Sequence, residues 1–192
     1  MRVIEKFIRT TVLYRGRAVG FRCDEVLLPN GKKGVREYLD HPGAVAVIPF
    51  LDSPFKVPLE KARVVMVKQY RYAVGEVTEE LPAGKLDGAE NLRACLRREL
   101  KEETGYTAGR FGKLLTYWPT PAFANEVIHI FWADRLKKGR MSPDDDEFLV
   151  RSADTFGNLL RKVKSGKIRD SKTMLGLLAF SEFFKASSGG CR

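Results

Sequence analysis

The residues best suited to chemistry are three glutamates in the segment 84–106, namely Glu99, Glu102 and Glu103. If this segment is an α-helix with about 100° per residue, Glu99 and Glu103 fall within its apolar sector and Glu102 borders that sector. The basic residues of the helix fall on the opposite, solvated side. A carboxylate turned toward a core costs free energy unless it is paired or bound to a metal ion, and hard divalent cations bind clustered oxygen ligands. The pattern therefore favours a metal site over a set of buried ion pairs.

Ion pairing within the helix is the alternative interpretation. Arg98 and Glu102 are four residues apart, a spacing at which opposite charges meet on a helix. We expect this pair to form. It leaves Glu99 and Glu103 without an obvious partner.

The same segment resembles the Nudix box. That signature is a glycine, five residues, a glutamate, seven residues, and then Arg-Glu-aliphatic-any-Glu-Glu-any-Gly-aliphatic. The one departure is Tyr106, which stands where an aliphatic residue is usual. A match at so many fixed spacings is far more specific than a lone glycine motif. The fixed positions are filled by Gly84, Glu90, Arg98, Glu99, Glu102, Glu103 and Gly105.

The resemblance extends along most of the chain and is closest to the Nudix hydrolases that cleave ADP-ribose and related nucleoside diphosphate sugars. It implies an α/β (α+β) fold, an α/β/α sandwich with a mixed sheet and a small N-terminal β appendage. The Nudix hydrolase domain is expected at 44–186. In this branch the N-terminal β segment, here 1–43, pairs with a second subunit, so the resemblance implies a homodimer. We expect the tail 187–192 to be disordered.

The activity that the resemblance implies is metal-dependent hydrolysis of ADP-ribose to AMP and ribose 5-phosphate, with Mg²⁺ or Mn²⁺ as the cofactor. A pyrophosphatase for another nucleoside diphosphate sugar, such as a GDP- or UDP-sugar, is the nearest alternative. An RNA-binding or RNA-processing role is a further alternative, but aromatic-basic RNA motifs are absent. The intact Glu99, Glu102 and Glu103 argue against a catalytically silent binding module.

By resemblance, Glu99 and Glu103 are metal ligands, and Glu102 is a ligand or supports the metal-bound waters. The backbone carbonyl of Ala83 is a further candidate ligand. The remaining residues of the box are expected to be structural. Charged hydrogen bonds between Glu90 and Arg98 hold the loop and the helix together, whereas the two glycines meet backbone requirements. These structural positions are Gly84, Glu90, Arg98 and Gly105.

The general base is expected in the acidic loop 143–148. By resemblance, Glu147 best matches the glutamate of the family, as general base or metal ligand, and Asp145 is the second candidate. A run of acids is otherwise typical of a solvated loop. A loop that moves over the substrate would be consistent with a gated site.

Three more residues are candidates for substrate binding by resemblance. Arg71 matches a position that contacts the diphosphate, for which its fork of donors is suited. Glu80 is a candidate for the base or the ribose of the nucleotide. Glu126 follows a segment in which this chain has Pro121-Ala122 where the branch usually has Pro-Gly, and a structural pair is the alternative for it.

The elements that must position these residues can be predicted from local patterns. Asn30-Gly31 is a hairpin turn signal within 1–43, and Gly105 is suited to end the box helix. The segments 41–50 and 62–70 are predicted to be buried strands, and 53–61 a loop. Further strands are expected at 111–118 and 126–136, and helices at 152–166 and 170–186, the second with Asp170 or Ser171 as N-cap.

Composition limits the remaining possibilities. The net charge of +10, from 34 bases and 24 acids, favours anionic partners such as phosphorylated metabolites, and the scattered bases indicate a basic surface rather than a nucleic-acid platform. No apolar run approaches the roughly 20 residues that span a bilayer, and the N-terminus lacks a signal-peptide core. Three cysteines without a paired spacing indicate a reducing, cytoplasmic setting, with Cys95 in the core. His41 and His129 are expected to pack or cap.

Overall fold

The computed structural model describes residues 3–188 and divides the chain into two compact units. Unit one consists of Met1–Gly43 and Trp118–Val127, and unit two consists of Ala44–Tyr117 and Ile128–Arg192. Most of the predicted disordered tail lies outside the described residues, but Ser187 and Ser188 form the end of a helix. None of the described helices is long and apolar enough to span a membrane.

Unit one is built on an antiparallel sheet of three strands, in the order β1 (Lys6–Arg15), β2 (Gly20–Leu27) and β3 (Lys33–Asp40). The predicted turn at Asn30-Gly31 is confirmed, because Gly31 adopts a φ of 82° and the Asn30 side chain accepts a hydrogen bond from the Lys32 amide at 3.0 Å. The segment 118–127 joins the end of β3 through backbone hydrogen bonds.

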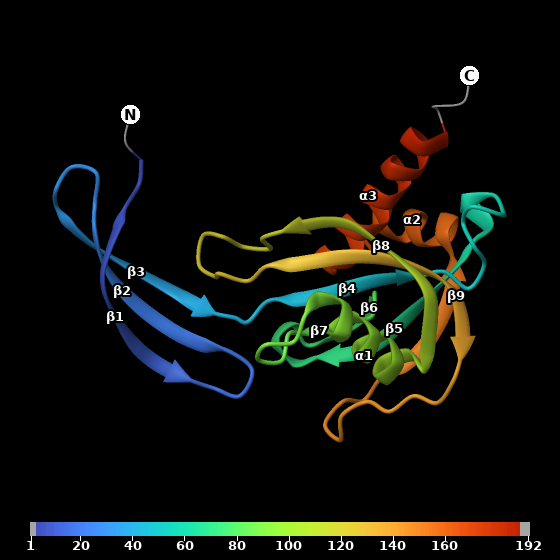
Figure 1. The fold of residues 1–192 in the computed structure, drawn as a ribbon, viewed down its shortest axis with the longest axis horizontal. Helices are drawn as coiled ribbons and strands as arrows, with labels where there is room; N and C mark the ends of the chain where they lie inside the picture. Colours follow the sequence, from blue (N-terminus) through green and yellow to red (C-terminus); the bar gives the residue numbers. More distant parts are fainter. Residues whose placement is uncertain (1–2, 189–192) are drawn as a thin grey trace. The chain divides into compact units, whose positions relative to one another are not determined.

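Unit two contains a mixed sheet of four strands, in the order β7-β4-β9-β8 (Figure 1). Only β4 and β9 are parallel; the other neighbours are antiparallel. The strands are β4 (Ala44–Pro49), β7 (Ala83–Lys85), β8 (Tyr106–Tyr117) and β9 (Ile128–Lys138). A second, antiparallel sheet has the order β10-β5-β6, with β5 (Arg63–Arg71), β6 (Glu76–Glu80) and β10 (Val150–Thr155).

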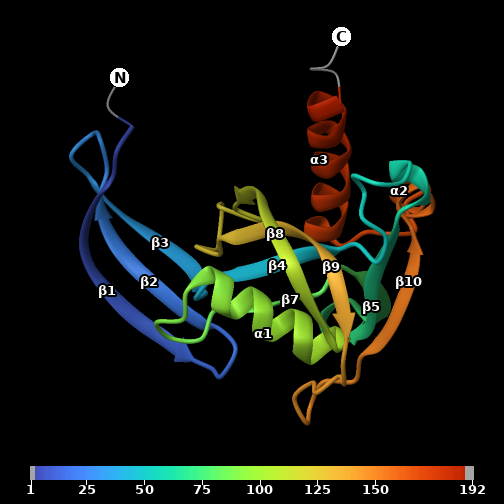
Figure 2. The ribbon, with the colours of Figure 1, turned by 45° about the vertical axis from the view of Figure 1, so that its right-hand side comes forward.

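The helices of unit two lie on opposite faces of the four-stranded sheet. Helix α1 (Leu92–Thr104) packs against Val45 and Val47 of β4, whereas α2 (Phe156–Lys164) and α3 (Ser171–Ser188) pack on the side of Ala46 and Ile48 (Figure 2). Successive residues of a strand point to opposite faces, so both faces of β4 are buried and its sequence is a continuous apolar run. The short 3₁₀ turns are η1 (Leu59–Lys61) and η2 (Tyr72–Val74). The predicted α/β fold with a mixed sheet is confirmed.

One predicted element is wrong in part. The segment predicted as a helix over 152–166 begins as strand β10, and α2 starts only at Phe156. Residues 150–155 pair with β5 along their whole length, and the Thr155 side chain then caps α2 by accepting a hydrogen bond from the Asn158 amide at 3.3 Å. Pairing with a distant strand overrides the local helical pattern here.

Candidate active site

Helix α1 is capped at both ends. The Asn91 side chain accepts hydrogen bonds from the amides of Arg93 and Ala94 at 3.1 and 3.0 Å. At the other end Gly105 adopts the left-handed conformation, with φ 71°, and donates to the Lys101 carbonyl at 2.8 Å. The predicted helix end at Gly105 is therefore confirmed, as is the burial of Cys95.

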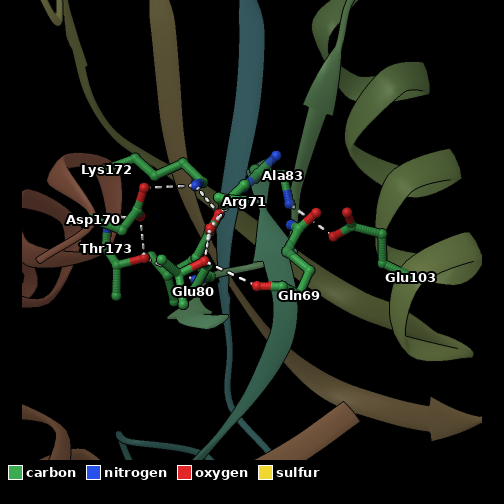
Figure 3. Close-up of polar contacts among 10 residues, drawn as sticks. Gln69, Arg71, Glu80, Ala83, Glu103, Asp170, Lys172 and Thr173 are labelled. Atoms are coloured by element: carbon green, nitrogen blue, oxygen red, sulfur yellow. Dashed lines mark hydrogen bonds and ion pairs between the residues drawn. The ribbon is translucent and has the colours of Figure 1, made fainter. Parts of the chain in front are cut away.

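Glu103 is a buried carboxylate, with 3% of its surface exposed. One of its oxygens accepts a hydrogen bond from the Ala83 amide at 2.9 Å (Figure 3). No lysine or arginine forms an ion pair with it within residues 3–188. Burial raises the pKa of Glu103 to about 8, and the charges of Glu99 and Glu147 add to the rise against the hydrogen bond from Ala83.

Glu99 lies one turn before Glu103 on the same side of α1. Burial raises its pKa to about 7, although the neighbouring Arg98 acts in the opposite direction. The expectation that Glu99 lacks a partner is wrong, because Arg98 Nη1 donates to Glu99 Oε1 at 2.7 Å. The same nitrogen also lies 3.1 Å from Glu102 Oε2, which confirms the predicted i,i+4 pair. The Arg98 guanidinium thus donates hydrogen bonds to both carboxylates, because its donors point in several directions.

Arg98 also joins the helix to the preceding loop. Its Nη2 donates to Glu90 Oε2 at 3.0 Å and to the Lys85 carbonyl at 3.1 Å. The charged hydrogen bonds expected between Glu90 and Arg98 are therefore present. Gly84, at the other end of that loop, lies directly against Glu99: a Cβ atom at Gly84 would lie 1.9 Å from the Glu99 carboxylate, so it fits only if that carboxylate moves.

A second charged cluster surrounds Glu80, whose exposed fraction is 1%. Arg71 donates to it twice, from Nε at 2.8 Å and from Nη2 at 2.6 Å (Figure 3). Thr78 also donates to it, at 2.5 Å. Lys172 forms an ion pair with the same carboxylate. Burial alone would raise the pKa of Glu80, but the hydrogen bond from Arg71 and the charge of Lys172 lower it to about 2.

Lys172 and Thr173 are members of this cluster that the sequence patterns did not identify. Asp170 caps α3 by accepting hydrogen bonds from the Thr173 amide and hydroxyl at 3.0 and 2.6 Å, and it also holds Lys172 Nζ at 2.9 Å. The Thr173 hydroxyl accepts from the Leu81 amide at 2.8 Å. The N-cap signal at Asp170 locates the start of α3, but nothing local shows that this start meets the end of β6.

The charge of Glu80 gives a pH-dependent prediction. Its pKa is lower in the folded chain than the ordinary value of 4.5, so the stabilisation is complete above pH 4.5 and is lost as the pH falls toward about 2. We expect Glu80→Gln to lower the free energy of unfolding by on the order of 3 kcal/mol at pH 7, and by progressively less below pH 4.5. Urea unfolding at several pH values measures this difference, with Glu60→Gln at an exposed position as control. If the wild type and Glu80→Gln differ in free energy of unfolding by the same amount down to pH 3, the lowered pKa of Glu80 would be contradicted.

The segment 139–142, which leads into the acidic loop, lies at the C-terminal end of α1. The Gly139 amide donates to the Gly105 carbonyl at 2.6 Å and the Ser142 amide to the Glu102 carbonyl at 3.0 Å. Glu147 and Asp145 are both exposed. The charge of Glu147 is among the causes of the raised pKa values of Glu99 and Glu103, so this glutamate lies within electrostatic reach of both.

Glu126 belongs to unit one, where its carboxylate lies 3.8 Å from His41 Nδ1. His41 caps the chain locally, because its Nδ1 accepts from the Gly43 amide at 3.0 Å. His129 lies 2.8 Å from the Thr116 hydroxyl. Both histidines thus make local contacts of the kind expected for them.

The donor set of α1 fits a hard divalent cation. Glu103 is a buried carboxylate that forms no ion pair with a lysine or arginine of the described residues, and the neighbouring Glu99 and Glu102 share one guanidinium. Clustered carboxylates of this kind repel one another, and a divalent cation would relieve that repulsion. Within the described part of the chain, no three acidic, histidine or cysteine side chains are already drawn together as a ligand set.

The chain matches one protein family and is similar to several known proteins. Residues 41–165 match the NUDIX domain. The ADP-ribose pyrophosphatase of Bacillus subtilis (strain 168) is 36% identical over 171 residues, which cover 88% of each chain. The methanol dehydrogenase activator of Bacillus methanolicus is 38% identical over 175 residues, or 90% of each chain. A crystal structure of an ADP compounds hydrolase superposes over 95% of both chains with a TM-score of 0.79; at 18% identity this similarity concerns the fold alone.

Proposed function

Because this chain belongs to the Nudix family, we propose that it is an ADP-ribose pyrophosphatase that hydrolyses ADP-ribose to AMP and ribose 5-phosphate. The observation that carries the reaction type is the buried carboxylate of Glu103 beside Glu99. The positive charge around these two acids does not balance their negative charge, so a cation would stabilise them. The substrate follows from the similarity to an ADP-ribose pyrophosphatase along most of both chains.

Nudix hydrolases generally use divalent metal ions, and we propose Mg²⁺ or Mn²⁺ for this chain. Glu99 and Glu103 would hold the ion, with Glu102 and the Ala83 carbonyl as further ligands. When bound, the ion would neutralise the diphosphate and lower the pKa of the attacking water. The Ala83 amide orients Glu103, and Arg98 orients Glu99 and Glu102.

The chain's own residues supply the remaining steps of the proposed reaction. Water attacks one phosphorus, a new P–O bond forms, and the bridging P–O bond breaks to release two phosphate monoesters. Glu147 accepts the proton of the attacking water as general base, and Asp145 is the second candidate. Arg71 donates hydrogen bonds to the diphosphate.

Glu80 and Glu126 are proposed to contact the substrate. The described contacts of the Glu80 carboxylate go to Arg71, Lys172 and Thr78, so orientation of the Arg71 guanidinium is a further role for it. For Glu126, the described contact is with His41, which also supports a structural pair.

We propose that two copies associate through the sheet of unit one. Every residue of β1 is exposed, including Phe7 with 64% of its surface accessible. Large exposed apolar patches mark interaction sites. Sedimentation equilibrium should give a dimer for the wild type and a monomer for Phe7→Glu; a monomeric wild type would refute the proposal.

The free thiols of Cys23 and Cys95 support a reducing compartment such as the cytoplasm.

The experiment that tests the function is a Mg²⁺-dependent assay with ADP-ribose, GDP-mannose, UDP-glucose, NADH, nucleoside triphosphates and 5′-triphosphate RNA. We expect ADP-ribose to be cleaved fastest, with AMP as a product. Faster cleavage of another nucleotide sugar would replace the substrate and keep the reaction. Binding without cleavage of any member would refute the enzymatic function.

Gly84→Ala should impair this reaction without unfolding the protein. The added methyl group would overlap the Glu99 carboxylate, which lies at the end of a flexible side chain and can swing away. We therefore expect a small change in melting temperature and a loss of roughly 10²-fold in kcat/KM, because the displaced carboxylate no longer holds its position. Gly20→Ala is the control, since its Cβ would make only ordinary contacts at 3.5 Å. Wild-type activity in Gly84→Ala would show that the position of Glu99 is not required.

A further inference from the structure

A pocket of about 600 Å³ lies against the outward side of α1, between the helix, β8 and the beginning of the acidic loop. We call it the outer pocket. A volume of this size suits a small organic ligand. It is lined by Arg97, Arg98, Leu100, Lys101, Glu102, Thr107, Ala108, Phe111 and Ser142.

The outer pocket opens on the side of α1 that carries Arg97 and Lys101, although the buried Leu100 and the Arg98–Glu102 pair also line it. With about 100° per residue, Arg97 and Lys101 lie about 120° and 160° around the helix axis from Glu103. Arg71, Glu80, Ala83 and Glu103 are not among its lining residues. A ligand that contacts Arg97 and Lys101 would therefore adjoin the proposed metal site at Glu102 without contacting Arg71 or Glu103.

The outer pocket contains two cations that are not neutralised. Neither the Arg97 guanidinium nor the Lys101 ammonium forms an ion pair with any residue that the structure describes. The only carboxylate in the lining is Glu102, and Arg98 Nη1 lies 3.1 Å from it. The lining therefore keeps a net positive charge that attracts an anionic group.

The rest of the lining is suited to a flat apolar group. Leu100 and Ala108 supply aliphatic surface, and Phe111 supplies an aromatic ring with the Arg97 guanidinium 5.8 Å from its centroid. The Thr107 and Ser142 side chains add hydroxyl groups. An aromatic ring and a guanidinium both offer flat faces against which a heteroaromatic base can pack.

We propose that the outer pocket binds a nucleoside monophosphate. The phosphate would lie between Arg97 and Lys101, and the base would pack against Phe111 and the aliphatic surface. This inference does not depend on the proposed hydrolysis, because Arg97, Lys101 and Phe111 have no role in that reaction and the binding needs no metal ion.

Isothermal titration calorimetry with AMP in the presence of EDTA tests the proposal. We expect Arg97→Glu and Lys101→Glu each to weaken one AMP-binding event at least roughly tenfold, because each replaces an attractive charge by a repulsive one. Arg93→Glu makes the same charge change at an exposed position of the same helix outside the pocket, and it should bind AMP as the wild type does. Adenosine, which lacks the phosphate, should bind at least roughly tenfold more weakly than AMP.

Amide hydrogen exchange identifies the face that the ligand covers. AMP should protect residues 97–111 in the wild type and also in Arg71→Ala, which removes the proposed diphosphate contact. Equal AMP affinity in Lys101→Glu and Arg93→Glu would overturn the proposal. So would protection confined to the Arg71 and Glu80 region, or the absence of measurable AMP binding. Failure of the hydrolysis assay would leave these results unaffected.

Discussion

Glu103→Gln should reduce hydrolysis by roughly 10²- to 10³-fold or more while leaving the metal-free protein at least as stable as the wild type. The amide oxygen of glutamine can still accept the hydrogen bond from the Ala83 amide, so the local packing is retained. The substitution also removes a carboxyl group whose ionised form is disfavoured by burial, since its pKa is raised to about 8. Activity and metal-free stability should therefore change in opposite directions.

Thermal melting with and without Mg²⁺ separates this prediction from simple unfolding. The melting temperature of the wild type should rise when Mg²⁺ is added, because an ion that binds only the folded state stabilises it. The melting temperature of Glu103→Gln should rise little. Glu60→Gln, an exposed carboxylate outside the site, should respond as the wild type does. A Mg²⁺ response in Glu103→Gln equal to that of the wild type would show that Glu103 is not a ligand.

The parts of the site that local patterns predicted are those that depend on one helix. The periodicity placed Glu99 and Glu103 on the core side of α1, and the glycine at 105 located its end. The burial of β4 was equally readable, because a strand covered on both faces is a continuous apolar run. Each of these features is determined within a short segment of the chain.

The features that were missed depend on contacts between distant segments. Strand β10 was predicted as the beginning of a helix because its pairing with β5 is invisible in its own sequence. The ion pair of Lys172 with Glu80 joins residues 92 positions apart. Arg98 is an intermediate case: its pairing with Glu102 follows from helical spacing, whereas its simultaneous contacts with Glu90 and Glu99 depend on the loop that precedes α1.

Glu147→Gln should reduce kcat by roughly 10²- to 10⁴-fold, because the amide cannot accept the proton of the attacking water. Its effect on metal binding should be smaller than that of Glu103→Gln, so the Mg²⁺-induced rise in melting temperature should remain. Asp145→Asn is the matched control, since it removes a carboxylate from the same exposed loop two residues earlier. The charge of Glu147 is among the largest causes that raise the pKa of Glu99 and Glu103, and the charge of Asp145 is not. A larger loss in Asp145→Asn than in Glu147→Gln would transfer the role of general base to Asp145, and wild-type activity in both variants would place the base outside this loop.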